Sequence, residues 1–378
     1  MLGVPSGPVL SVPLGLPRFL ARLNARGYVD CRAMGEIVVL GEISCPSGEV
    51  VILDGGILGM WSGQRSPNEL DPRGLGIDDP QVCADVSGAV DYAVVGPDAE
   101  GAAASFPRRP TRYHYDIPAS RTADWTELFA QHCREHRWDA TLQPAAAQVP
   151  HRERARRCAV ERLAGFLVFG LPAVAVDGLP TRAPVRLEAQ RSDGPWHGWS
   201  QMILRVRDAP VATTTGVGLV GVDAARLAFA DPDALAQWRH DEPLDGLADV
   251  AFWGVAAAEA AVEFSADPLT AAGDEGSYGW TDLPIRSALR RATTIEAWMN
   301  AEPTRRMVVD FRPHSHHWQV MRQVRASDNE TGTITIGDAQ ILFAMTSWGD
   351  GLFPVHADRD AAGNLVSLRI TLAEQLSN

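Results

Sequence analysis

Two residues near the end of the sequence have the types that general acid–base chemistry needs. Asp350 lies between Gly349 and Gly351, and His356 follows after a short apolar run. A carboxylate and an imidazole within hydrogen-bond reach can pass a proton to and from a substrate near neutral pH. The glycines permit a tight turn, and Trp348 beside them would give a cleft an aromatic wall. Asp350 and His356 are therefore the candidate catalytic residues, and Trp348, Gly349 and Gly351 are candidate ligand contacts.

A structural role for Asp350 competes with this hypothesis. An aspartate in a glycine-flanked turn commonly caps the turn by accepting a hydrogen bond from nearby backbone, as in an Asx-turn. The run after Gly351 has the composition of a strand, so Asp350 and His356 meet only if that strand folds back. The sequence leaves both roles open.

The sequence holds one histidine cluster, Asp310-Phe-Arg-Pro-His314-Ser-His316-His317. On an extended segment, alternate side chains share a face, which groups Asp310, His314 and His316. Two histidines and a carboxylate are the ligands of a facial metal triad. The spacing differs from that of the usual triad, however, and Pro313 interrupts the segment. A polar loop is the favoured interpretation, and the sequence predicts no metal site and no cofactor.

The composition excludes several classes of protein. All 34 basic residues of the 378-residue chain are arginines. Without lysine, Schiff-base chemistry is impossible, including covalent attachment of pyridoxal phosphate, and a Walker phosphate loop lacks its essential residue. The formal charge of −13 and the pI near 5.2 argue against a nucleic-acid partner.

The cysteines and the apolar runs indicate the cellular compartment of the protein. No CxxC pair occurs, and the five cysteines are widely spaced: Cys31, Cys45, Cys83, Cys133 and Cys158. Such a set is typical of reduced thiols in the cytosol rather than of a disulfide framework. No apolar run of about 18 residues is present, and the N-terminal segment lacks the basic start of a signal peptide. We expect a cytoplasmic protein without a membrane partner.

Short β-branched runs separated by turn residues dominate the chain. Residues 36–43 and 49–54 flank Pro46-Ser47-Gly48 and are predicted to form a hairpin. Further strands are expected at 91–95, 111–116, 166–176, 184–190, 201–207, 217–229, 307–311, 318–325, 333–336, 340–345, 352–356 and 365–372. Helices are expected at 124–138, 152–163, 232–238 and 284–299. This order predicts an α+β fold of predominantly antiparallel β-sheets with a few peripheral helices.

Three segments are expected from this pattern: a β-rich N-terminal segment over residues 1–120, a helical segment over 121–165 and a β-rich domain over 166–378. The acidic stretch 274–282, which lies within the last of them, is expected to be a lid or a solvated loop.

The C-terminal block Trp348-Gly-Asp-Gly-Leu-Phe-Pro354 resembles a motif of an uncharacterised bacterial domain-of-unknown-function family, number four-two-four-one in that series. The Pro46-Ser47-Gly48 turn and Asp54 resemble an earlier motif of the family. The resemblance implies a shared fold and adds Ser47 and Asp54 to the candidate ligand-binding residues. Where the family usually carries an aspartate, this chain has Ala256. The family has no established activity, so the resemblance implies no reaction.

Two functions from different classes follow. The first is an enzyme that acts on a small polar metabolite by Asp/His general acid–base chemistry, without a covalent cofactor. The alternative is a binding or immunity-type protein whose acidic surface recognises a basic protein partner without catalysis. If the first is right, Asp350 and His356 should converge with Trp348 on one concave pocket.

Overall fold

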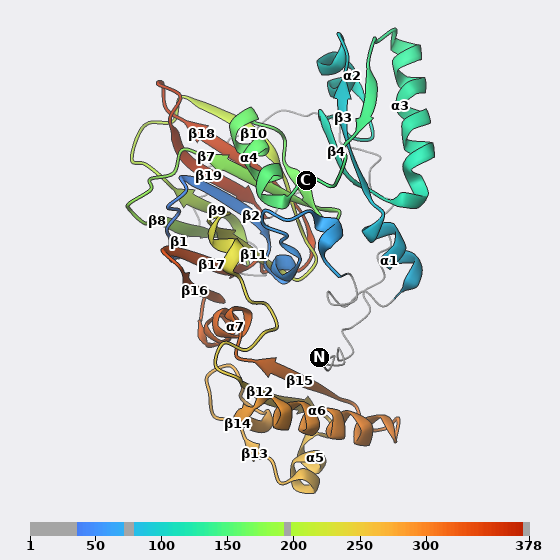
Figure 1. The fold of residues 1–378 in the computed structure, drawn as a ribbon. Helices are drawn as coiled ribbons and strands as arrows, with labels where there is room; N and C mark the ends of the chain where they lie inside the picture. The colour runs from blue at the N-terminus through green and yellow to red at the C-terminus, as the bar shows by residue number, and fades with distance from the viewer. Residues whose placement is uncertain (1–35, 72–78, 193–197, 373–378) are drawn as a thin grey trace, which may run out of the picture.

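The computed structural model of the chain describes residues 36–71, 79–192 and 198–372 (Figure 1). Two six-stranded antiparallel sheets form its centre. The first has the order β1 (Ile37–Ile43), β8 (Val185–Arg191), β9 (Trp199–Arg205), β19 (Leu365–Thr371), β18 (Gly351–Arg359) and β10 (Thr213–Val222). The second has the order β16 (Thr331–Ile336), β17 (Ala339–Met345), β11 (Arg226–Ala230), β2 (Glu49–Asp54), β7 (Leu171–Asp177) and β6 (Phe166–Val168).

The two sheets pack face to face around one apolar core. Ile52 of β2 and Phe229 of β11 contribute to this core from the second sheet, and Leu187 of β8 and Ile370 of β19 contribute from the first. Residues of alternate parity on β2, such as Leu53, enter a second core on the outer face of the same sheet. Helices α4 (His151–Glu161) and α7 (His316–Ala326) cover that face, which is why β2 reads as an unbroken apolar run.

The predicted hairpin of residues 36–43 and 49–54 is wrong, although both strands exist. β1 pairs with β8, and β2 pairs with β7 and β11 in the other sheet. The Pro46-Ser47-Gly48 segment therefore carries the chain across from one sheet to the other. Two apolar strands joined by a turn can form a hairpin or belong to two different sheets. The second arrangement is found here because it buries one face of each strand in the core between the sheets.

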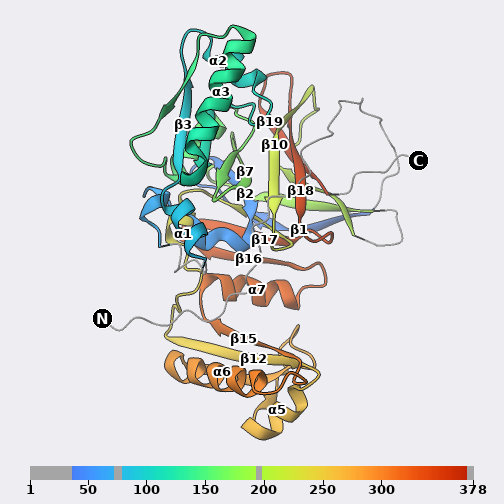
Figure 2. The ribbon, with the colours of Figure 1, turned by 90° about the vertical axis from the view of Figure 1, so that its right-hand side faces the viewer.

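Two smaller units lie at opposite ends of the sandwich (Figures 1 and 2). The first, which we call the 80–144 module, contains α1 (Pro80–Ser87), β3 (Val90–Val95), α2 (Ala99–Ser105), β4 (Tyr113–Ile117), η4 (Ala119–Arg121), α3 (Thr122–His136) and β5 (Thr141–Pro144). The second, the 247–313 module, contains β12 (Leu247–Gly254), α5 (Ala257–Phe264), β13 (Asp267–Pro268), β14 (Tyr278–Pro284), α6 (Ile285–Asn300) and β15 (Met307–Pro313). Short 3-10 helices complete the structure at η1 (Gly55–Met60), η2 (Pro67–Glu69) and η5 (Ala234–Gln237).

The α+β fold with antiparallel sheets and peripheral helices is confirmed. The structure groups the chain differently from the three expected segments, however. Strands β1 and β2 belong to the sandwich that the rest of the chain completes, and the 80–144 module runs across the boundary expected at residue 120. No helix in the described ranges is long and apolar enough to cross a bilayer.

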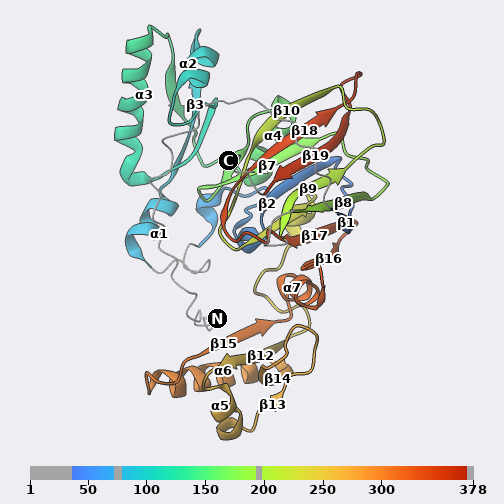
Figure 3. The same ribbon diagram turned by 180° about the vertical axis from the view of Figure 1, so that it is seen from behind.

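The helices expected near 124–138, 152–163 and 284–299 are present as α3, α4 and α6. The strand expected at 318–325 is instead helix α7, which lies between the sandwich and the 247–313 module (Figure 3). Ser315 caps this helix by accepting a hydrogen bond from the Trp318 amide at 3.2 Å. Val320 and Val324 then fall on one buried face at helical spacing.

Two fully buried histidines make the fold sensitive to acid. Burial, assisted by Arg109, lowers the pKa of His114 to about 4. Burial, assisted by Arg154, also lowers the pKa of His151 well below its ordinary value. Each ring accepts a hydrogen bond at Nδ1, from the Trp125 indole at 3.0 Å and from the Ser62 amide at 3.0 Å respectively. Both rings are therefore neutral in the folded protein.

We expect stability to fall as the pH drops from about 6.5 towards 4, because these histidines take up protons only when the chain unfolds. Each contributes a slope of up to about 1.4 kcal/mol per pH unit. Urea unfolding at a series of pH values measures the total slope. His114→Gln should reduce that slope by up to about 1.4 kcal/mol per pH unit. An unchanged slope would contradict the lowered pKa of His114.

Candidate functional site

The C-terminal motif anchors the turn between β10 and β11. The Asp350 carboxylate accepts a hydrogen bond from the Ala225 amide at 3.0 Å. The Trp348 indole donates to the Trp199 carbonyl at 2.6 Å, and the Thr346 amide donates to the Ala225 carbonyl at 2.9 Å. These bonds hold the motif against neighbouring backbone, which gives Asp350 the structural role that competed with catalysis.

His356 lies well away from Asp350. β18 begins at Gly351 and continues to Arg359, paired with β10 on one side and β19 on the other. At about 3.3 Å per residue, an extended strand separates the two side chains by roughly 16–20 Å. The structure therefore does not assemble the expected catalytic pair, because pairing on both sides keeps β18 from folding back. Burial lowers the pKa of His356, and the positive charge of Arg369 lowers it further.

Asp54 also contacts the turn between β10 and β11. This buried carboxylate accepts hydrogen bonds from the Gly56 amide at 2.7 Å and from the Asp223 amide at 2.6 Å. Burial raises its pKa, against the opposing effect of these amides and of Arg226. The structure thus brings Asp54 and Asp350 to one turn, residues 223–225. Each carboxylate accepts a hydrogen bond there from a backbone amide.

We expect Asp350→Asn to leave the protein almost unchanged. The side-chain oxygen of asparagine can still accept the Ala225 hydrogen bond, whereas Asp350→Ala loses it, at a cost of about 0.5–1.5 kcal/mol. Urea unfolding compares the two variants. A folded Asp350→Asn protein that has lost its activity would contradict the structural role and restore the catalytic one.

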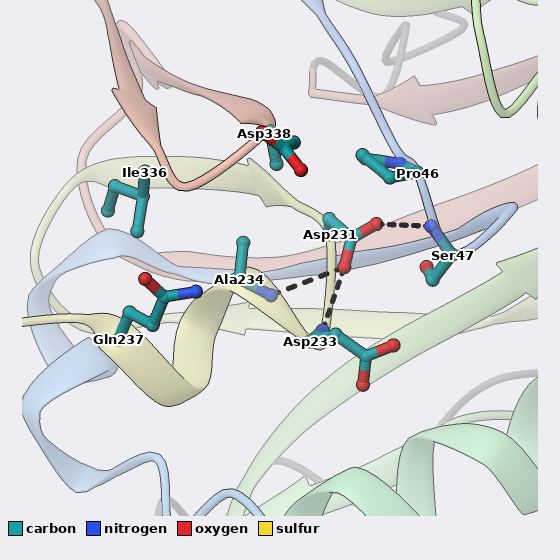
Figure 4. Close-up of a pocket in the computed structure, with 9 residues that line it drawn as sticks. Pro46, Ser47, Asp231, Asp233, Ala234, Gln237, Ile336 and Asp338 are labelled. Atoms are coloured by element: carbon teal, nitrogen blue, oxygen red, sulfur yellow. Dashed lines mark hydrogen bonds between the residues drawn. The ribbon is translucent and has the colours of Figure 1, made fainter.

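Ser47 lies in a shallow pocket of about 300 Å³ that three aspartates line. The pocket is lined by Pro46, Ser47, Asp231, Asp233, Ala234, Gln237, Ile336, Asp338 and Ala339 (Figure 4). Asp231 is buried and accepts hydrogen bonds from the Ser47 amide at 2.8 Å, the Asp233 amide at 2.8 Å and the Ala234 amide at 3.3 Å. The Ser47 hydroxyl is bonded within its own loop, to the backbone of Glu49. Among the described residues, no general base contacts this hydroxyl. The three aspartates give the pocket an acidic lining, which suits a cationic group.

The three residues of the histidine cluster do not share a site. Asp310 accepts a hydrogen bond from the Arg312 guanidinium at 2.6 Å, and His316 accepts from the Arg239 amide at 2.9 Å. His314 instead turns towards carboxylates that the sequence did not associate with it. It is 4% exposed and joins Asp245, Asp249 and Asp282 in what we call the His314 centre.

The polar atoms of the His314 centre lie close together. Nδ1 of His314 lies 2.9 Å from Asp245 Oδ2, and Nε2 lies 3.0 Å from Asp249 Oδ1 and 4.0 Å from Asp282 Oδ1. One ligand atom each from Asp249, Asp282 and His314 lies within 4.8 Å of the others. Two ligands bonded to a transition metal at right angles lie about 3 Å apart. His314 and Asp249 already have this spacing, and Asp282 needs a shift of about an ångström.

The sheet of the 247–313 module positions these groups. Its central strand β12 carries Asp249, β14 carries Asp282 on one side, and His314 follows β15 on the other. The register between β12 and β14 shifts between Ala248 and Val250, and Asp282 has a φ of 55°. Such bulges re-aim side chains, and here the Asp282 amide donates to Asp249 Oδ1 at 2.9 Å.

Further partners orient two of the three prospective ligands. The Trp318 indole donates to Asp249 Oδ2 at 3.2 Å, and its ring stacks on His314 with centroids 4.1 Å apart. Asp245 holds Nδ1 of His314 from the side away from Asp249. A histidine whose second nitrogen bonds a carboxylate is the usual arrangement around bound metals. Burial lowers the pKa of His314, but the bonds to Asp249 and Asp245 outweigh it and raise that pKa overall.

Sequence reasoning missed this centre because it expected neither β12 nor β14. Asp282 fell within the stretch expected to be a lid or a solvated loop, whereas Tyr278–Pro284 is a strand in the structure. Asp249 sits in Leu247–Gly254, an apolar run that was a usable strand signal. No pattern in the sequence predicts the bulge that brings Asp249 and Asp282 together.

No family model, curated protein or solved structure matches this chain.

Proposed function

We propose that the protein is an enzyme that acts on a small polar molecule with a divalent metal ion bound by Asp249, Asp282 and His314. The observation that supports this most is the convergence of one imidazole and two carboxylates from three separate segments, within 4.8 Å. Mixed nitrogen and oxygen ligands suit Mn²⁺, Fe²⁺ or Zn²⁺. An ion held there would polarise a substrate oxygen or lower the pKa of a bound water.

The accessibility of the centre fits a reaction with small molecules. His314 and Asp249 are nearly buried, which limits competing water around the ion, whereas the Asp282 side chain is 74% exposed. Three protein ligands leave further coordination positions for water or substrate, as catalytic metal sites require. This proposal keeps the small polar substrate of the sequence-based hypothesis and moves the chemistry from Asp350 and His356 to the His314 centre.

Two expectations from the sequence are part of this proposal. Among the described residues, Cys45, Cys133 and Cys158 are free thiols, which supports a reducing, cytoplasmic location. Kinship with the domain-of-unknown-function family four-two-four-one is supported by the C-terminal motif at Trp348–Pro354.

The proposal is tested by thermal unfolding and turnover of the metal-free full chain. We expect Mn²⁺ or Zn²⁺ to stabilise the protein by about 2.7 kcal/mol at a concentration 100 times the Kd. The metal-loaded protein should hydrolyse some members of a panel of small chromogenic esters and phosphate esters, and EDTA should abolish this activity. Absence of any metal-dependent shift would overturn the metal site. A shift without turnover of any ester would leave a metal-binding protein and overturn the enzyme.

A second candidate function is recognition of a basic partner without catalysis. The acidic pocket around Asp231, Asp233 and Asp338 and the net charge of −13 favour it. Binding of an arginine-rich peptide that weakens in Asp233→Asn and Asp338→Asn, and falls steeply with salt, would support this function.

A further inference from the structure

A second pocket, of about 390 Å³, lies on the 247–313 module. It is formed by α6, β14 and the end of α5, and is lined by Phe264, Trp280, Ser287, Arg290, Arg291, Thr294 and Ile295. We propose that this pocket binds a small phosphate monoester, with Arg290 and Arg291 on the phosphate and the rings of Phe264 and Trp280 against the organic part.

The polar side of the pocket comes from one face of α6. Ser287, Arg290, Arg291 and Thr294 are spaced so that they lie next to one another along a helix. The Arg290 guanidinium is within 3.5 Å of the Ser287 hydroxyl. Two guanidinium forks and the Ser287 hydroxyl therefore border the same hollow, whereas the Thr294 hydroxyl donates to the Arg290 carbonyl at 2.7 Å. Such forks bind the oxygens of phosphate groups in a bidentate manner.

The charges of this face are not neutralised by neighbours. Within residues 36–71, 79–192 and 198–372, neither Arg290 nor Arg291 forms an ion pair with a carboxylate. The chain as a whole has 47 acidic residues against 34 basic ones, so this pocket places two positive charges together on a protein whose net charge is negative. A dianion such as a phosphate monoester would match both positive charges.

The apolar side of the pocket can hold an organic group. The Arg291 guanidinium lies over the Trp280 ring, 4.2 Å from its centroid, which fixes the guanidinium at the pocket edge. Phe264 and Ile295 continue the apolar surface. The volume falls in the range of pockets that hold small organic ligands.

This pocket is separate from the His314 centre. Val250 of β12 packs in the core beneath α6 and pairs with Trp280, whereas the next residue back, Asp249, belongs to the His314 centre. Successive residues on a strand point to opposite faces of the sheet. The two sites therefore lie on opposite faces of one sheet, and ligand binding in the pocket does not depend on the proposed metal site.

Titration calorimetry with three probes tests the inference on the full chain. We expect AMP to bind with a Kd below about 1 mM, and adenosine, which lacks the phosphate, to bind about 10-fold more weakly or not at all. Ribose 5-phosphate, which lacks the base, should bind more weakly than AMP. Failure of both phosphate compounds to bind would overturn the site, and equal binding of AMP and ribose 5-phosphate would overturn the aromatic contact.

Substitutions test whether AMP binds in this pocket. Arg290→Gln and Arg291→Gln should each weaken AMP binding about 10-fold. Arg306→Gln removes the same charge from an exposed position of the module outside the pocket, and should leave the Kd within about twofold. Asp249→Asn should also leave it unchanged, which separates this inference from the metal site. Equal weakening by Arg306→Gln and Arg290→Gln would show a nonspecific charge effect and overturn the proposal.

Discussion

Replacing Arg154 by methionine should lower the free energy of unfolding by about 3–5 kcal/mol, because it leaves buried carboxylates without a partner. The Arg154 side chain is fully buried and donates to Asp91 at 3.0 Å and to Asp116 at 2.7 Å. It also donates to the carbonyl oxygens of Val149 and Leu167 at 2.8 Å. These bonds join the 80–144 module to α4 and β6, so one guanidinium links several segments of the chain.

The matched control is Arg156→Met on the same helix. Arg156 forms an exposed pair with Glu153, and surface pairs contribute little to stability. Urea unfolding followed by tryptophan fluorescence measures both variants. If Arg154→Met costs no more stability than Arg156→Met, the buried network does not have the role that its geometry indicates.

Asp249→Asn should weaken metal binding by about 100-fold or more, since it removes one of the two carboxylate charges among the three ligands. Even loss of a group that only orients a ligand costs 10–100-fold. Asparagine preserves the shape of the side chain, and its oxygen can still accept a hydrogen bond from the Asp282 amide or from Trp318. The fold should therefore survive, which circular dichroism checks. The measurement is the metal-dependent rise in unfolding temperature, expected to disappear.

Asp267→Asn is the control for this substitution. Asp267 is exposed on β13 of the same module and takes no part in the His314 centre, so it changes the net charge equally without removing a ligand. Its metal-dependent shift should equal that of the unmodified protein. An Asp249→Asn protein that binds Mn²⁺ within about threefold of the unmodified chain would exclude this residue as a ligand.

The sequence was sufficient for the fold class because the dominant signals are local. Apolar periodicity predicts α3, α4 and α6, and β-branched runs predict the sandwich strands. Strand pairing depends on residues far apart in the sequence, and the predicted pairing was wrong. Residues 36–43 and 49–54 were expected to pair with each other, but the core between the sheets assigns them to different neighbours.

The site was less predictable than the fold for the same physical reason. Asp249, Asp282 and His314 are far apart in sequence, and only the pairing of β12 with β14 and β15 brings them together. The bulge beside Asp249 and the positive φ of Asp282 depend on that pairing. The Asp350 motif was visible because its residues are contiguous, but contiguity did not show which residues would lie near Asp350 in the fold.

The central claim is most directly tested by anomalous X-ray scattering from crystals of the full chain grown with Mn²⁺. At the manganese absorption edge we expect one strong peak within about 2.0–2.4 Å of Asp249 Oδ1, Asp282 Oδ1 and His314 Nε2. In that state His314 Nε2 should no longer donate to Asp249, while Asp245 should still hold Nδ1. No peak at this position with Mn²⁺ in excess, and His314 Nε2 still bonded to Asp249, would contradict the metal centre.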